Sequence, residues 1–125
     1  MKRKKILLVD DEPDVNLSIK LALEGNSFEV DAFDSGLSAL ENFRKGLYDL
    51  LILDIKMPNM NGFQLYREIK KIDDKVKVCF LTAGEMYHGA YADIFNELDT
   101  KCFMRKPMGN QELLKHLNEI MTKSN

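Results

Sequence analysis

Short apolar runs alternate with helical patterns five times along this 125-residue chain, and this alternation constrains the fold more than any other feature. The runs Ile6–Val9, Leu50–Leu53 and Val76–Leu81 are almost continuously apolar, which is typical of strands buried on both faces of a parallel sheet. Phe28–Phe33, which is more mixed, and Lys101–Met104 complete the expected strands. We therefore predict an α/β fold in which helices cover both faces of a parallel sheet.

Helical periodicity fills each gap between these runs. Pro13 and Gly25 bracket the first expected helix, while Ser35 and Gly46 are the expected N-cap and closing residue of the second. The apolar faces of the five helices are Val15–Leu23, Leu40–Phe43, Leu65–Ile72, Tyr87–Leu98 and Leu113–Met121.

An aromatic stripe marks the fourth helix, because Tyr87, Tyr91 and Phe95 recur every four residues. Core packing is the first explanation for such a stripe. A partner surface is the alternative, since tyrosines are enriched at interfaces.

Composition excludes several classes of protein. The formal net charge is -2, too balanced to indicate nucleic-acid binding. No apolar stretch approaches the roughly 20 residues of a membrane span, so we expect a cytoplasmic protein. Cys79 and Cys102 lie in apolar runs, where buried free thiols are the default. The chain ends soon after the fifth helix, so we expect one domain over residues 1–125 without an output domain.

Chemically distinctive side chains follow the expected strands. Ligands of an open α/β sheet bind beyond the carboxyl ends of its strands, so these side chains are the candidate site. The first strand is followed by the acids Asp10, Asp11 and Glu12, and the third strand ends in Asp54. Thr82 follows the fourth strand, and Lys106 follows the fifth.

Carboxylates that converge on one edge either shift their pKa values or bind a cation. Oxygen ligands alone favour a hard cation, and Mg²⁺ suits a site with few protein ligands. Lys106 and Thr82, with this cation, could each take one oxygen of a phosphoryl group. Because a carboxylate can accept a phosphoryl group covalently, the set points to acyl-phosphate chemistry on one aspartate. Taken singly, the acids and Thr82 could instead cap helices, and Lys106 could be a surface residue.

The motifs resemble those of the receiver domains of two-component response regulators, over essentially the whole chain. The segment from Asp54 to Gly62 matches the family pattern D-x-x-M-P-x-x-[DN]-G, and Ile6–Glu12 matches its acidic-pair motif. Phe33–Leu40, Leu81–Ala83 and Lys106–Pro107 match three further signatures. The resemblance implies a doubly wound, flavodoxin-like sheet with strand order 2-1-3-4-5.

The resemblance also implies a role for each site residue. Asp54 would be the phosphoacceptor, and Asp11, Asp54 and the backbone carbonyl of Lys56 would bind Mg²⁺. Asp10 would act mostly through a metal-bound water. Lys106 would pair with the phosphoryl oxygens, and the peptide bond between Lys106 and Pro107 would be cis. Thr82 would swing toward the phosphoryl group, and Phe103 would rotate with it.

The implied function is a signalling phosphoacceptor rather than an enzyme. Its partners would be a histidine kinase or phosphotransfer protein and a separate effector that reads the face of the fourth helix, fifth strand and fifth helix, with homodimerisation left open. Three alternatives compete. An aspartyl-phosphate phosphohydrolase usually carries a second aspartate where Lys56 stands, and a flavodoxin-like nucleotide binder would be repelled by the acids after the first strand. A receiver-like scaffold that is never phosphorylated would not need the complete acceptor set.

Overall fold

The computed structural model describes residues 3–83, 91–98, 102–106 and 109–122. Within these ranges strands and helices alternate, as the apolar runs predict. In chain order the elements are β1 Lys5–Val9, α1 Pro13–Glu24, β2 Glu29–Phe33, α2 Gly36–Asn42, β3 Leu50–Asp54, α3 Gly62–Ile72, β4 Lys77–Thr82, α4 Ala92–Glu97, β5 Phe103–Arg105 and α5 Asn110–Thr122.

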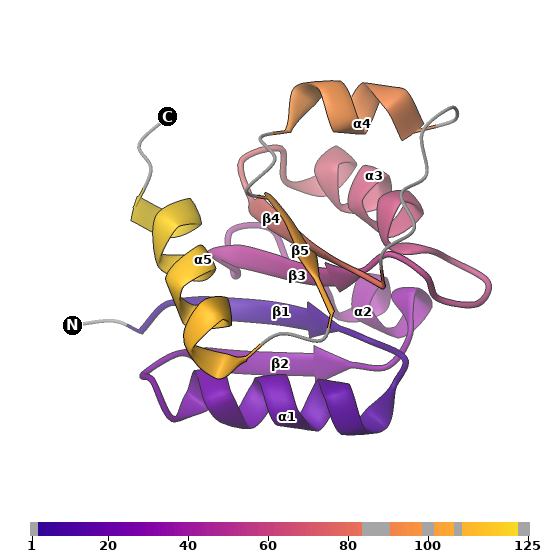
Figure 1. Ribbon diagram of the computed structural model, residues 1–125. Coiled ribbons are helices and arrows are strands. Elements are labelled where there is room, and N and C mark those ends of the chain that lie inside the picture. Colours follow the sequence, from indigo (N-terminus) through magenta and orange to yellow (C-terminus); the bar gives the residue numbers. More distant parts are fainter. Residues whose placement is uncertain (1–2, 84–90, 99–101, 107–108, 123–125) are drawn as a thin grey trace.

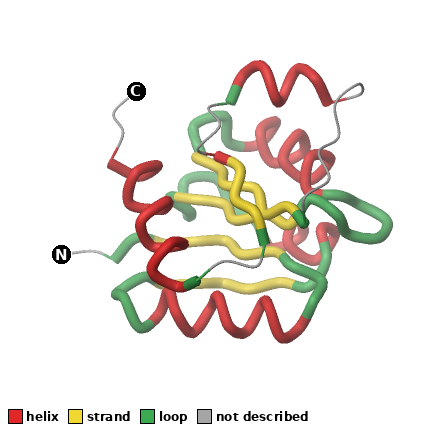
Figure 2. Tube along the Cα trace, viewed as in Figure 1, coloured by secondary structure: helices red, strands yellow, loops and turns green. Residues whose placement is uncertain are grey.

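The strands form one parallel sheet in the order β2-β1-β3-β4-β5, which confirms the predicted topology. Helices lie on both faces of this sheet (Figures 1 and 2). Alternate residues of a strand face opposite sides, so Leu7 and Val9 join a core with α2, α3 and α4. Ile6 and Leu8 join a second core with α1 and α5. The runs are continuously apolar because both faces of these strands are buried, each in a different core.

Strand β3 lies at the centre of the sheet and carries the acceptor candidate at its end. Its residues Leu50–Leu53 are fully buried. Burying a leucine or isoleucine contributes about 1.5–3 kcal/mol relative to exposure. This strand therefore positions Asp54 on one of the most firmly held segments of the protein.

Helix α2 is shorter than predicted, because it ends at Asn42 rather than near Gly46. Phe43 leaves the helix with extended backbone, is 4% exposed, and stacks on Tyr48 at 5.7 Å between ring centroids. Gly46 lies in the following turn, where its φ of 78° suits glycine. Burial of the Phe43 ring outweighs the local preference to continue the helix.

Some expectations lie outside the described residues: Tyr87, the side chain of Phe95 and the cis bond to Pro107. Neither Cys79 nor Cys102 forms a disulfide bond, as expected, and Cys79 is buried while Cys102 is only partly buried. Among the described helices, none combines the length and apolarity that crossing a membrane requires.

Candidate functional site

Two carboxylates are buried where adjacent central strands end. Asp10 follows β1 and is fully buried, and Asp54 ends β3 and is 4% exposed. The Asp10 Oδ1 accepts a hydrogen bond from the Glu12 N–H at 2.9 Å. The Asn16 amide donates to the carbonyls of Asp10 and Phe33, both at 2.9 Å, and so pins the ends of β1 and β2. This network holds the first acidic loop against the sheet.

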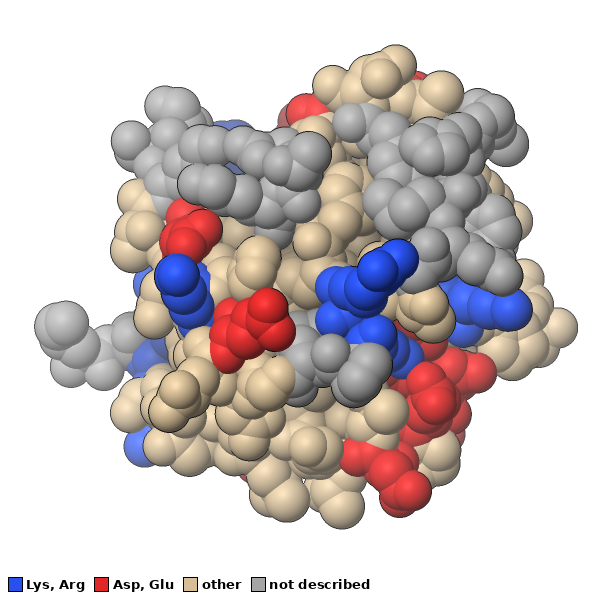
Figure 3. Space-filling model, viewed as in Figure 1, with Lys and Arg blue, Asp and Glu red and all other residues tan. Residues whose placement is uncertain are grey.

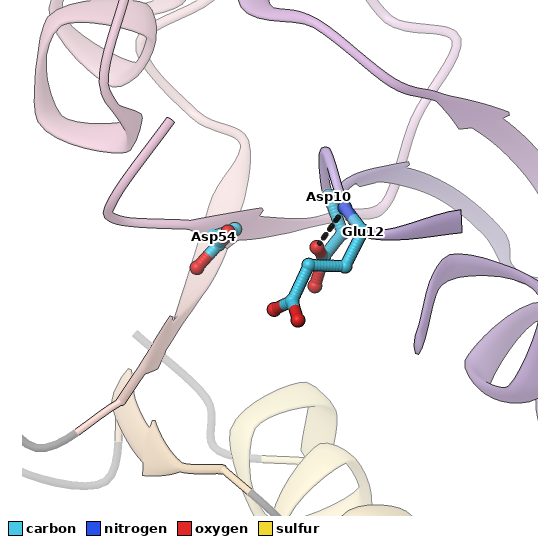
Figure 4. A group of neighbouring side chains, drawn as sticks. All are labelled: Asp10, Glu12 and Asp54. Carbon is cyan, nitrogen blue, oxygen red and sulfur yellow. Dashed lines mark hydrogen bonds between the residues drawn. The ribbon is translucent and has the colours of Figure 1, made fainter. Parts of the chain in front are cut away.

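A third acid, Glu12, approaches these two. Each of Asp10, Glu12 and Asp54 offers a carboxylate oxygen, and these oxygens lie within 4.8 Å of one another. Figure 4 shows the side chains converging from the ends of β1 and β3. Figure 3 shows acidic side chains gathered on the side toward which the strand arrows of Figure 1 point, with basic side chains beside them. Around Asp54 is an open hollow of about 420 Å³ lined by Asp11, Glu12, Asp54, Lys56, Met57, Pro58, Ala83 and Lys106.

Lys106 supplies the positive charge at this edge. Its Nζ lies 2.8 Å from Glu12 Oε1, 2.9 Å from Asp10 Oδ2 and 3.5 Å from Asp54 Oδ1. Its backbone N–H donates to the Thr82 carbonyl at 2.7 Å, which aligns the ends of β4 and β5. Burial disfavours the charged ammonium, but the hydrogen bond to Glu12 and the nearby carboxylates of Asp10 and Asp54 outweigh it and raise the pKa of Lys106. The ammonium therefore stays charged over the working pH range.

Burial dominates the protonation of the two aspartates. It raises the pKa of Asp54 to about 7, with the charge of Asp10 adding to the effect and Lys106 opposing it. A hydrogen bond with Asp11, which requires a proton on one of the two carboxyls, raises it further. Burial also raises the pKa of Asp10, although the Glu12 N–H and Lys106 oppose this. Glu12 is exposed, and Lys106 lowers its pKa.

The donor set fits a hard divalent cation. Within the described residues Asp10 Oδ2 is buried and has no partner of hydrogen-bond geometry, although Lys106 neutralises it as an ion pair at 2.9 Å. An acceptor aimed into an acidic cluster in this way is ready to bind a cation or a cation-bound water. All the available donors are oxygens, which Mg²⁺ prefers. The cluster is therefore compatible with a magnesium site.

The buried Asp54 leads to a prediction about stability. A carboxyl whose pKa is raised on folding favours the folded state below its unfolded pKa, here 3.8, and this contribution is lost as pH rises through about 7. In EDTA, Asp54→Asn should therefore be more stable than the wild type at pH 8 by roughly 1–3 kcal/mol. The gain should shrink toward pH 4. Urea unfolding of both proteins at several pH values measures this, and a pH-independent difference would contradict it.

Five of the predicted site residues lie together. Asp10, Asp11, Asp54, Lys56 and Lys106 all contact or line the acidic cluster or its hollow. The sequence predicts Glu12 only as one of the acids or as a helix cap, yet its side chain makes no cap hydrogen bond and pairs with Lys106. No signal in the local sequence pattern points to this pairing.

The two switch candidates lie on neighbouring strands. Thr82 ends β4 and is 7% exposed, and Phe103 opens β5 and stacks on Phe80 at 5.5 Å. The alternative that Thr82 caps the fourth helix is wrong, since Tyr91 occupies the N-cap of α4.

A doubly wound sheet with carboxylates and a lysine at its carboxyl edge is the arrangement expected of a receiver-type α/β domain. Residues 6–118 match the model of the response regulator receiver domain family, so the chain belongs to this family. The resemblance found in the motifs is thus confirmed, and the phosphohydrolase and nucleotide-binding alternatives are not favoured.

Similar proteins match nearly the whole length of the chain. The transcriptional regulatory protein TrcR of Mycobacterium tuberculosis is 30% identical over 120 residues, which cover 96% of this chain and 46% of TrcR. The chain thus spans less than half of that relative's length. A receiver domain protein from Clostridium thermocellum is 32% identical, with a TM-score of 0.75 over 95% of this chain and 94% of that one. The HemR receiver domain from Leptospira biflexa is 26% identical, with a TM-score of 0.85 over 98% of both chains.

Proposed function

We propose that Asp54 accepts a phosphoryl group from a phospho-histidine of a sensor kinase or phosphotransfer protein, with Mg²⁺ as cofactor. The observation that carries this proposal is the set of contacts around Lys106, which lies within 3.5 Å of both buried aspartates. An ammonium held in this position can exchange carboxylate oxygens for phosphoryl oxygens with little movement. The hollow of about 420 Å³ beside Asp54 leaves room for the incoming group.

The transfer forms one bond and breaks one. A carboxylate oxygen of Asp54 attacks phosphorus while the phosphorus–nitrogen bond of phospho-histidine breaks, and the imidazole leaves with the bonding electron pair. Asp11, Asp54 and the Lys56 carbonyl would hold the cation, with Asp10 acting through a water. The cation would offset the charge that develops on the phosphoryl oxygens. Lys106 would pair with one of these oxygens.

The phosphorylated form would act as a switch. Thr82 would turn toward the phosphoryl group and Phe103 would rotate with it, which biases the protein between two conformations. The effector would be a separate protein that binds the α4–β5–α5 face, and homodimerisation through this face is a further outcome. The same residues would promote hydrolysis of the acyl phosphate, so that the signal ends without another enzyme. We infer that residues 1–125 act as one domain in the cytoplasm, without contacting nucleic acid or membrane.

Acetyl phosphate with Mg²⁺ tests the acceptor. Intact-mass spectrometry should show one added phosphoryl group on the wild type and none on Asp54→Asn. Asp49→Asn is the matched control, because Asp49 precedes the same strand at its opposite end and accepts a hydrogen bond from the Lys5 N–H at 2.8 Å. This control should be phosphorylated like the wild type. A folded wild type that gains no phosphoryl group with Mg²⁺ present would overturn the proposal.

A further inference from the structure

Asn61 is the last residue of the loop that follows Asp54 (residues 55–61, the acceptor loop), and its side chain makes two separate sets of contacts. Asn61 is the N-cap of α3, where its Oδ1 accepts from the Gln64 N–H and its own N–H donates to Gln64 Oε1, both at 2.9 Å. Its remaining amide group, Nδ2, donates to the Tyr91 hydroxyl at 3.0 Å. One side chain therefore both starts α3 and holds the residue at which α4 begins.

Asn61 lies next to the acceptor backbone. The N–H of its neighbour Gly62 donates to the Ile55 carbonyl at 2.9 Å, which closes the loop that starts at Asp54. Asn59 in this loop adopts a φ of 69°, in the left-handed region that asparagine tolerates better than most residues. This closing hydrogen bond connects the backbone beside Asp54 to the backbone beside Asn61, so it offers a route by which a change at Asp54 can reach Asn61.

Tyr91 is held by more than its hydroxyl. Its ring stacks on Phe63 with 4.9 Å between centroids, and the Arg67 guanidinium lies 5.0 Å from the ring centroid. Arg67 also pairs with Asp93 of α4 at 2.6 Å. These contacts tie the first turn of α4 to α3.

The aromatic contacts of Tyr91 and Phe63 extend to β5, the strand that carries Phe103. Phe63 lies 4.8 Å from Phe80 and 6.5 Å from Phe103 between ring centroids. Tyr91 thus meets the acceptor loop through its hydroxyl and the β5 aromatic through Phe63. A shift in either region changes the contacts that place α4.

We propose that Tyr91 is a positioning residue which, through Asn61, holds α4 in the arrangement of the unphosphorylated protein. The inference rests on the proposed function of Asp54. In this proposal the Asn61–Tyr91 hydrogen bond, at 3.0 Å, forms in the unphosphorylated arrangement and is lost in the phosphorylated one. Removing it favours the phosphorylated arrangement by the linkage between the two states.

The test compares phosphorylation rates with acetyl phosphate and Mg²⁺. Tyr91→Phe removes only the hydroxyl, and Asn61→Ser keeps an N-cap oxygen while removing Nδ2. Loss of one hydrogen bond should accelerate phosphorylation about three- to tenfold in each variant, and the double variant should be no faster than either. In NMR spectra of the unphosphorylated variants, amides of α4 should move toward their positions in the beryllofluoride-loaded wild type.

Tyr48→Phe is the matched control, because it removes another tyrosine hydroxyl, one that donates to Asp31 at 2.7 Å. It should change neither the rate nor the α4 amides. Unchanged rates in Tyr91→Phe and Asn61→Ser, or additive effects in the double variant, would overturn the inference alone. A wild type that gains no phosphoryl group would overturn the proposed function, and the inference with it.

Discussion

Gly62→Ala is expected to destabilise the protein by about 3 kcal/mol or more. A Cβ at this position would lie only 2.4 Å from the Asp54 carbonyl oxygen and 3.1 Å from the Ile55 Cα. Both neighbours are backbone atoms of β3 and its continuation, so neither can rotate away as the tip of a flexible side chain would. Either α3 or the end of β3 must move.

The effect should extend from stability to function. Because the displaced atoms belong to Asp54 itself, the variant that still folds should be phosphorylated by acetyl phosphate at least tenfold more slowly, as misplacing a reacting group commonly costs on the order of a hundredfold. Urea unfolding and intact-mass spectrometry measure the two effects. Gly109→Ala is the control, since a Cβ added there would meet no atom of the described residues within 4 Å, and it should cost about 1 kcal/mol or less. Equal stability of the two variants would show that the close approach at Gly62 is not limiting.

Lys106→Met should be nearly as damaging, for an electrostatic reason. The substitution keeps an apolar side chain of similar length but leaves the carboxylates of Asp10 and Asp54 without their cation. Removing one partner of a buried ion pair typically costs about 3–5 kcal/mol. We expect a loss of about 3 kcal/mol at pH 8 in EDTA, because Lys106 is 12% exposed and partly screened.

The pH dependence of this loss identifies its cause. Burial raises the pKa of both aspartates, and Lys106 opposes it, so its removal raises these pKa values further. The carboxyls then favour the folded state only while protonated, and the destabilisation should grow as pH rises from 5 to 8. Millimolar Mg²⁺ should restore part of the stability by supplying the missing charge.

A surface lysine provides the control for this electrostatic prediction. Lys75→Met removes a charge near the amino end of β4, and Lys75 is exposed, so the change should stay within about 0.5 kcal/mol at either pH. Urea unfolding of all three proteins, with and without Mg²⁺, makes the comparison. A Lys106→Met penalty that is the same at pH 5 and pH 8 would mean that lost packing, rather than lost charge, is responsible.

The local hydrophobic pattern predicts the strands correctly, but it predicts the wrong end for helix α2. Runs such as Leu50–Leu53 face two cores, so their composition records their burial directly. Helix α2 ends before Gly46 because Phe43 is drawn into the core beside Tyr48. Gly46 indicates where the chain turns, but it does not indicate that α2 ends earlier, at the residue before the buried Phe43.

The candidate site also contains features that the sequence predicts and one contact that it does not. Asp10, Asp54, Thr82 and Lys106 were identifiable because the carboxyl ends of parallel strands must meet at one edge. The pairing of Glu12 with Lys106 joins residues 94 positions apart, and nothing in the local pattern of either predicts it.

By itself the sequence determined the fold class, the strand ends and the chemistry gathered there, because hydrophobic periodicity and residue type are local properties. Only the tertiary structure decided which acid pairs with Lys106, why Gly62 must lack a side chain, and how Asn61 meets Tyr91. These contacts depend on how loops and helices pack against one another to within an ångström. Such packing arises from the whole chain at once, so no single segment encodes it.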